Sequence, residues 1–191
     1  MKKYQIIYAD PPWEVKRGPD WNSNGPSNPL PYPTMKTEDI GNLPIKELAD
    51  RNSWLFLWVI NKYIPEAYEV AKKWGFKPSC LLTWCKPKHG IGIGGTFIQT
   101  TEHLLFCRRG TKTARYRVDT TWFEHKRLVH SKKPDFFRTL IESLGEGNNR
   151  INKIELFARE KIGTWDVWGN EVESDIELFT NSPKRNITYD T

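Results

Sequence analysis

The sequence YQIIYADPPW (residues 4–13) joins a short, mostly apolar run to an acidic residue and two prolines. Aromatic and β-branched residues dominate the run from Tyr4 to Ala9, which is typical of a buried strand. Proline has no backbone N–H to donate to a neighbouring strand, so the strand must end at Asp10. The pattern therefore predicts a carboxylate held rigidly at the carboxyl end of a strand.

Downstream, segments with the period of a strand alternate with segments with the period of a helix. Strand-like runs lie at 54–60, 79–85, 102–108 and 153–158, and helix-like runs at 65–74 and 134–145. Thr37 is expected to cap one further short helix, which Leu43-Pro44 limits. The alternation predicts an α/β fold with a mainly parallel sheet. Ligands bind at the carboxyl ends of such strands, where we expect Asp10 and the residues after Phe157 to meet.

Length and composition indicate a single domain. A chain of 191 residues can bury one sizeable core, so we expect one domain over residues 1–173 and a polar tail over 174–191.

The three cysteines form no CxxC pair, which predicts neither a zinc site nor a disulfide framework, and no metal is expected. No long apolar segment is present, so we expect a soluble, cytoplasmic protein that does not bind a membrane.

Positive charge is concentrated in one segment. The chain carries a formal net charge of +6, yet residues 108–133 alone hold nine Lys or Arg and two acids. This segment is expected to be an insertion that contacts a nucleic-acid backbone. A solvated basic loop explains the charge equally well. The residues expected to contact phosphates are Arg115, Arg117, Lys126 and Arg127.

The Asp10 block suits chemistry on an aromatic amine. An exocyclic amine of adenine is a poor nucleophile, because its lone pair is delocalised into the ring. The Asp10 carboxylate and the Pro11 carbonyl can accept its hydrogen bonds and stabilise the positive charge that develops during methyl transfer. Trp13 and Tyr32 are expected to stack on or contact the base. Taken alone, the block is more often an ordinary rigid turn, and the two rings more often pack within a loop.

Six ordered blocks make nearly the whole chain resemble a known family, the DPPW-type adenine-N6 methyltransferases. This family includes the eukaryotic messenger-RNA adenosine methyltransferase and smaller bacterial and phage DNA enzymes. The resemblance rests on ADPPW (9–13), LPY (30–32), LFLWV (55–59), HSKKP (130–134), KIELFAR (153–159) and GNE (169–171). Six blocks in order are far more specific than one motif.

The resemblance implies a Rossmann-like class I methyltransferase fold in circularly permuted (beta-class) order, with the catalytic block before the principal cofactor-binding block. It implies S-adenosyl-L-methionine as the methyl donor and S-adenosyl-L-homocysteine as the product. The catalytic residues that it implies are Asp10, Pro11, Pro12 and Trp13.

The same resemblance implies the residues that bind the cofactor. Asp10 and Pro11 would approach its methionine end, and Lys133 would bind its carboxylate. Phe157 and Arg159 would surround its adenosine. Asn170 and Glu171 match an Asn-Gln pair that contacts its adenine or ribose, and Glu171 departs from the pair's second residue. From the residues alone, Lys133 is better explained as a surface lysine beside a helix cap formed by Ser131.

The leading hypothesis is a DNA adenine-N6 methyltransferase of bacterial or phage type. It rests on the compact chain, the intact Asp10 block and the basic segment. One alternative keeps the reaction but assigns RNA as the acceptor. Another is a non-catalytic nucleic-acid-binding subunit of a methyltransferase complex, and a homodimer or a partner subunit remains open.

Overall fold

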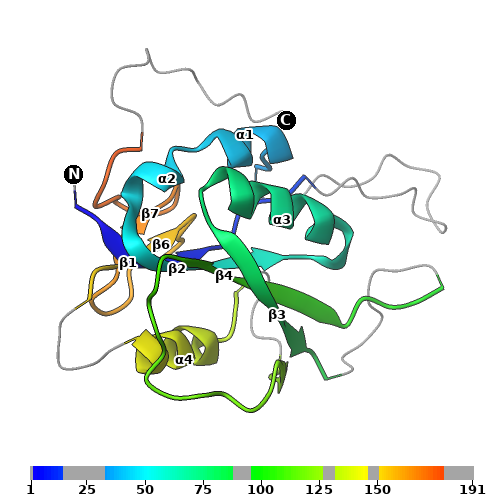
Figure 1. Ribbon diagram of the computed structural model, residues 1–191. Coiled ribbons are helices and arrows are strands. Elements are labelled where there is room, and N and C mark those ends of the chain that lie inside the picture. The colour runs from blue at the N-terminus through cyan, green and yellow to red at the C-terminus, as the bar shows by residue number, and fades with distance from the viewer. Residues whose placement is uncertain (1, 15–32, 88–95, 127–131, 146–150, 179–191) are drawn as a thin grey trace.

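The structure is a computed structural model, and it describes residues 2–14, 33–87, 96–126, 132–145 and 151–178. Over these residues, seven strands form one sheet in the order β5-β3-β4-β2-β1-β6-β7 (Figure 1). The strands are β1 (Tyr4–Ala9), β2 (Ala49–Val59), β3 (Lys77–Cys85), β4 (Thr101–Arg109), β5 (Trp122–Glu124), β6 (Lys153–Leu156) and β7 (Asp166–Trp168). The strands expected from the sequence are thus confirmed, with ends that differ by a few residues.

The sheet is mainly parallel, as predicted. β1 pairs in parallel with β2 and β6, β6 with β7, and β3 with β5. β4 pairs antiparallel with both β2 and β3, so it alone among the described strands runs the other way. This mixed sheet with helices on both faces is a Rossmann-like methyltransferase fold. The reversal of β4 has one consequence for the site: its first residues lie at the edge where the other strands end.

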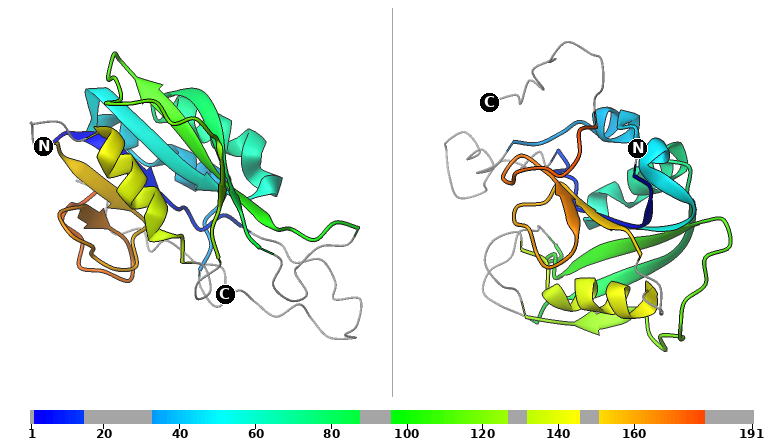
Figure 2. Two further views of the ribbon diagram at one scale, coloured as in Figure 1. Left: turned by 90° about the horizontal axis from the view of Figure 1, so that it is seen from below. Right: turned by 90° about the vertical axis from the view of Figure 1, so that its left-hand side faces the viewer.

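Helices cover both faces of the sheet (Figure 2). The helices α1 (Thr37–Asn42), α2 (Ile45–Leu48) and α3 (Ile64–Lys73) lie on one face, with a 3-10 turn, η1 (Asn61–Tyr63), before α3. The opposite face carries α4 (Asp135–Gly145).

The sequence predicted that Thr37 caps α1, and this prediction was wrong. Thr37 is the first helical residue, and Lys36 occupies the cap position without a side-chain hydrogen bond. The helix begins at this point because of a contact of Met35, the residue before Lys36. The backbone N–H of Met35 donates to the Pro12 carbonyl (2.8 Å), which keeps the chain extended up to Lys36.

The core between the sheet and α1 to α3 is mainly aliphatic. Ala67, Val70 and Ala71 of α3 are buried, which fits the helical period predicted for residues 65–74. Trp74 is fully buried at the end of this helix, and its indole N–H donates to the Ile40 carbonyl (3.1 Å). The hydrogen bond satisfies the one polar atom that burial of this ring takes from water.

The core beneath α4 is aromatic and is bordered by ion pairs. Phe137 of α4 packs edge-on against Trp58, with ring centroids 5.0 Å apart. Arg138 reaches the Glu155 carboxylate of β6 (2.8 Å), and both side chains are about seven-eighths buried. Burial raises the pKa of Glu155, and Arg138 opposes that rise. These contacts fix the first turns of α4 to the strand next to β1.

The start of the expected polar tail packs on the protein. The Asp175 carboxylate accepts a hydrogen bond from the Val167 backbone N–H (2.9 Å), and Leu178 is buried. Residues 179–191 lie outside the described residues. The helices of the described residues include none that is both long and apolar enough to cross a membrane.

Candidate active site

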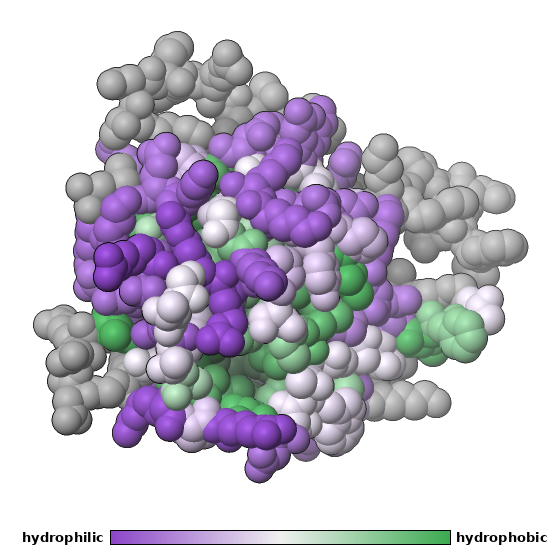
Figure 3. Space-filling view, viewed as in Figure 1, coloured by the Kyte–Doolittle hydropathy of each residue, from purple (hydrophilic) through white to green (hydrophobic). Residues whose placement is uncertain are grey.

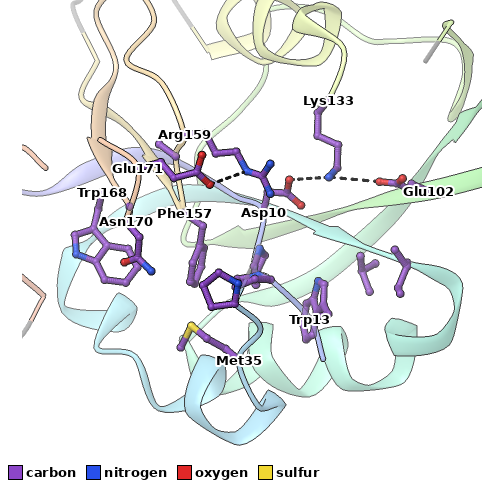
Figure 4. A pocket seen from close by; sticks show the side chains of 17 residues that line it. Asp10, Trp13, Met35, Glu102, Lys133, Phe157, Arg159, Trp168, Asn170 and Glu171 are labelled. Atoms are coloured by element: carbon purple, nitrogen blue, oxygen red, sulfur yellow. Dashed lines mark hydrogen bonds and ion pairs between the residues drawn. The ribbon is translucent and has the colours of Figure 1, made fainter. Parts of the chain in front are cut away.

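A pocket opens at the carboxyl edge of the sheet, where β1, β2 and β6 end (Figure 4). Asp10 to Trp13 form its centre, and Phe157 to Arg159 together with Trp168 to Glu171 form one wall. Lys133, just before α4, and Glu102, at the start of β4, complete the opposite side. The fold therefore brings together two blocks of sequence that are nearly 150 residues apart.

The Asp10 carboxylate is held by a lysine. Lys133 Nζ lies 2.6 Å from Asp10 Oδ2 and 3.4 Å from Glu102 Oε2, so it bridges two carboxylates. Lys86 pairs with the other oxygen of Glu102. The four groups form a charge-balanced chain, and the Lys133 side chain is only 15% exposed. Because such partly buried pairs are poorly screened, this network fixes where the Asp10 carboxylate points.

The network shifts the pKa values of its members in different directions. Burial raises the pKa of Asp10, while Lys133 opposes the rise. Burial also tends to raise the pKa of Glu102, but the charges of Lys133 and Lys86 outweigh burial, so the pKa of Glu102 is lowered. Burial disfavours the charged form of Lys133, yet its two carboxylate partners outweigh this and raise its pKa. At neutral pH Lys133 therefore stays protonated between its partners.

The prolines and Trp13 form a tight, buried turn. The Trp13 backbone N–H donates to the Pro11 carbonyl (2.9 Å), which leaves one lone pair of that oxygen for another donor. The Trp13 indole N–H donates to the Trp58 carbonyl (2.9 Å). Tyr63 stacks on one face of Trp13, with centroids 5.7 Å apart. Trp13 thus lines the pocket as a buried ring with one face covered, and contact with a base remains a prediction.

The opposite wall is aromatic and polar. Phe157 has a left-handed backbone, with φ of 62°, which is unusual for a residue that is not glycine. Its ring packs edge-on against Trp168, with centroids 5.3 Å apart. The strained conformation turns the chain sharply at the end of β6, and the Ala158 N–H then donates to the Trp168 carbonyl (3.0 Å). Strain of this kind, held by its surroundings, is often found at ligand sites.

The charged residues of this wall face each other. Arg159 Nε lies 3.4 Å from Glu171 Oε1, and both side chains are substantially exposed. Next to them, a Cβ on Gly169 would lie 2.1 Å from the Ala158 carbonyl oxygen. Only glycine allows the two loops to approach so closely. The loop that carries Asn170 and Glu171 is thereby drawn against the end of β6.

The structure separates the residues predicted for the cofactor from most of those predicted for the nucleic-acid backbone. The pocket contains all of the described residues proposed for catalysis and cofactor binding. Tyr32 and Arg127 lie outside the described residues. The Arg115 backbone N–H donates to Leu144 at the end of α4 (3.1 Å), so Arg115 and Arg117 lie toward the opposite edge of the sheet. Of the three predicted backbone contacts that the structure describes, only Lys126 follows β5 at the pocket edge.

Sequence reasoning missed Glu102 and Lys86. In a parallel strand the first residue would lie at the far edge, and the sequence pattern predicted a mainly parallel sheet without identifying β4 as reversed. Trp168 was also missed, because a short strand ending in Trp resembles any buried strand. The signal that was available is the pair of charged residues, Lys86 and Glu102, that border otherwise apolar strands at a hairpin.

Comparisons with known proteins agree with this geometry. The model of the MT-A70 family matches residues 4–171. The type II methyltransferase M.MunI of a Mycoplasma species is 29% identical over 94% of this chain and 82% of its own length. The human N(6)-adenosine-methyltransferase catalytic subunit METTL3 is 27% identical over 91% of this chain and 29% of its own length. The non-catalytic subunit MTB of Arabidopsis thaliana is 40% identical over 57% of this chain and 14% of its own length.

Proposed function

The chain belongs to the MT-A70 family of S-adenosylmethionine-dependent adenine-N6 methyltransferases, and we propose that it is an active enzyme that methylates the N6 amine of adenine in DNA. The observation that carries this proposal is the Asp10 carboxylate, fixed by Lys133 beside the Pro11 carbonyl in a pocket with an aromatic wall. Two hydrogen-bond acceptors on neighbouring residues that line one pocket are what an exocyclic amine requires.

The pocket residues fit the methyl donor. Phe157 and Trp168 offer apolar ring surface for an adenine, and Asn170 offers an amide that can pair with its polar edge. Lys133 offers a cation for the amino-acid carboxylate. Arg159 and Glu171 border the wall where ribose hydroxyls would lie. When bound, S-adenosylmethionine supplies a methyl group activated by a sulfonium.

Asp10 and Pro11 act on the acceptor. Both accept hydrogen bonds from the N6 amine and so localise the lone pair of the nitrogen toward the methyl group. As the N–C bond forms, the electron pair of the broken S–C bond remains on sulfur. Positive charge then develops on N6, where the two oxygens stabilise it more than they stabilise the ground state.

Asp10 also receives the proton that N6 loses. Burial raises the pKa of this carboxyl group, which makes it a better acceptor than an exposed aspartate. Lys133 keeps it ionised until the base arrives, and Glu102 with Lys86 keeps Lys133 within reach. When the cofactor is bound, its carboxylate would offer Lys133 a further anionic partner in the same pocket.

DNA is favoured as the acceptor by the share of each relative's own length that this chain matches. M.MunI, which is not named for a ribonucleoside, is matched over most of its length, whereas METTL3, named for adenosine, is matched over less than a third. A second candidate is a non-catalytic subunit, since MTB carries that name. The Asp10 network argues against it, because a silent subunit has no need for a carboxylate aimed into a pocket.

One experiment separates these possibilities. The purified chain is incubated with labelled S-adenosylmethionine and with DNA or RNA of the same sequence, and the nucleosides are then analysed by mass spectrometry. N6-methyldeoxyadenosine is expected from DNA, and none from the Asp10→Ala variant. Product from RNA alone would assign the enzyme to RNA. An absence of both product and S-adenosylhomocysteine binding in calorimetry would favour the non-catalytic subunit.

A further inference from the structure

A cluster of cations lies at the edge of the sheet opposite the pocket. Here β2 and β3 begin, β4 ends, and α2 lies close by. We call the six residues the amino-edge cluster: Lys46, Arg51, Lys77, Arg108, Arg109 and Lys112. The first four are exposed, and the last two are half-buried. Figure 3 shows strongly hydrophilic side chains gathered on this side, over the start of β2 and the end of β4.

The fold holds these cations in place. Arg109 donates to the Lys46 carbonyl (2.9 Å), and Arg108 donates to the Lys112 carbonyl (3.1 Å). Gly110 has a φ of 67°, and a Cβ on it would lie 2.2 Å from the Arg51 carbonyl oxygen. The turn after β4 therefore packs directly on the start of β2. The cluster is a preformed surface, not a set of scattered side chains.

None of these six side chains forms an ion pair with a carboxylate of the described residues. Burial lowers the pKa of Lys112, and the charge of nearby Asp50 opposes this shift without forming an ion pair with it. An ion pair would cancel the positive charge locally. Unpaired cations that share an edge instead project a positive field into solvent.

The chain connects this cluster to the pocket. After Arg108 it runs beneath α4, where Tyr116 donates or accepts a hydrogen bond with Ser143 (2.6 Å), and reaches β5 at the pocket edge (Figure 1). Along the way lie Arg115 and Arg117, and the rings of Tyr116 and Trp122, which are 48% and 57% exposed. Basic residues interleaved with exposed rings suit a nucleic-acid chain.

Resting on the proposed function, we propose that the amino-edge cluster is a second contact site for the backbone of the same nucleic acid whose adenine enters the pocket. On β4, Arg109 of the cluster follows Glu102 of the pocket by seven residue steps, or about 24 Å at the rise of a strand. A duplex advances by about 3.4 Å for each base pair, so the two sites are about seven base pairs apart.

Nucleic acid fits the cluster better than other anionic partners. A membrane surface favours cations beside exposed apolar side chains that can insert among lipids. The large exposed apolar residues of the described chain include Phe97, Ile98, Trp122 and Phe136, and none belongs to this edge. An acidic protein would explain the charge but not the basic track that leads to the pocket.

The test compares two matched double variants. Arg51→Gln with Lys77→Gln removes two charges from the cluster, and Lys72→Gln with Lys73→Gln removes two exposed charges from α3. Binding is measured by fluorescence anisotropy over a range of salt concentrations. The DNA duplexes carry about four or about fifteen base pairs on each side of the target adenine. Calorimetry with S-adenosylhomocysteine checks that each variant keeps its pocket.

The wild-type chain and the α3 variant should bind the long duplex at least tenfold more tightly than the short one. In the cluster variant this preference should shrink, and the slope of log K against log salt should fall by about two. An unchanged slope and length preference would overturn the proposal, as would an equal change in the α3 variant. If the slope falls in the cluster variant but the wild-type chain transfers no methyl group, the proposed function is wrong and the contact site is supported. If the wild-type chain transfers methyl groups but the slope of the cluster variant is unchanged, the contact site is wrong and the proposed function is supported.

Discussion

At the carboxyl edge of the sheet, the cations around the pocket contact carboxylates, whereas the cations of the amino-edge cluster contact none among the described residues. Lys133 bridges Asp10 and Glu102, and Arg159 faces Glu171. Arg51 and Lys77, at the other edge, stand exposed in solvent. One sheet therefore carries two kinds of positive charge about 24 Å apart.

The difference follows from what each edge has to do. Charges that are paired and partly buried hold a reacting group in one position, because their partners and the lack of water restrict them. Unpaired, exposed charges restrict nothing, but they attract polyanions at a distance and respond strongly to salt. Changes at the pocket edge should therefore affect chemistry, stability and titration, and changes at the amino edge should affect binding alone.

The largest effect is expected from Asp10→Asn. The amide keeps the size of the carboxylate but loses its charge, so the positive charge on N6 in the transition state loses its main stabilisation. We expect the single-turnover rate of methyl transfer to fall by about 10²–10³-fold. The measurement is a rapid-quench assay with labelled S-adenosylmethionine.

The melting temperature of this variant provides the control. Because burial already raises the pKa of Asp10, its charge is not favoured by folding, and a neutral side chain should leave the melting temperature nearly unchanged. Asp39→Asn, at an exposed position of α1 outside the pocket, serves as the matched variant and should keep full activity. An Asp10→Asn chain that is folded and fully active would disprove the role of the carboxylate.

Next in size is the loss of stability expected from Arg138→Met. Arg138 pairs with Glu155 beneath the pocket edge, and the change would leave a buried carboxylate without its cation. The free energy of unfolding should fall by about 3 kcal/mol. Arg51→Met at the amino edge breaks no ion pair with a described residue and should change the free energy of unfolding by less than about 0.5 kcal/mol. Urea denaturation of both variants measures the difference.

A second variant decides the cause. Arg138→Met combined with Glu155→Leu removes the orphaned charge and should recover most of the lost stability. If the double variant is as unstable as the single one, packing of the Arg138 stem, and not the charge, explains the loss.

The sequence predicted this architecture because its strongest signals are local. The apolar run before Asp10 and the period of α3 depend on neighbouring residues only, and both were correct. The pocket was predictable to the same degree, because residues at the carboxyl ends of parallel strands must converge.

What could not be predicted depends on contacts between distant segments. Glu102 enters the pocket only because β4 runs antiparallel, and strand direction is set by the pairing of whole strands. The amino-edge cluster draws on α2, β2, β3 and β4, so no single stretch of sequence carries its charge. Arg115 and Lys126 belong to one basic stretch, yet the chain between them passes from one edge of the sheet to the other.

Titration should also separate the two edges. Lys133 lowers the pKa of Asp10 against the effect of burial, so Lys133→Met should move the titration of Asp10 to higher pH. Lys133→Arg keeps the charge and should leave it nearly unchanged. The carbon chemical shift of the Asp10 carboxyl group, followed by NMR from acid to neutral pH, measures this directly. Arg51→Met should have no effect, and a titration that is identical in Lys133→Met would contradict the ion pair.

The smallest effect is expected from Glu171→Gln, which tests whether the exposed ion pair at the pocket edge contributes to stability or to cofactor binding. The Arg159–Glu171 pair is exposed to solvent, with side chains 43% and 58% accessible, and its separation is 3.4 Å. Water and salt screen such a pair, so its loss should cost less than about 0.5 kcal/mol of stability. The new amide can still hydrogen-bond a ribose or adenine, so the affinity for S-adenosylhomocysteine should change by no more than about threefold. Calorimetry at low and high salt measures this, with Glu173→Gln on the same loop as the matched control. A tenfold loss of affinity for S-adenosylhomocysteine at both salt concentrations would mean that the Glu171 charge itself binds the cofactor. The exposed wall would then hold its ligand through charge, as Asp10 and Lys133 are proposed to do.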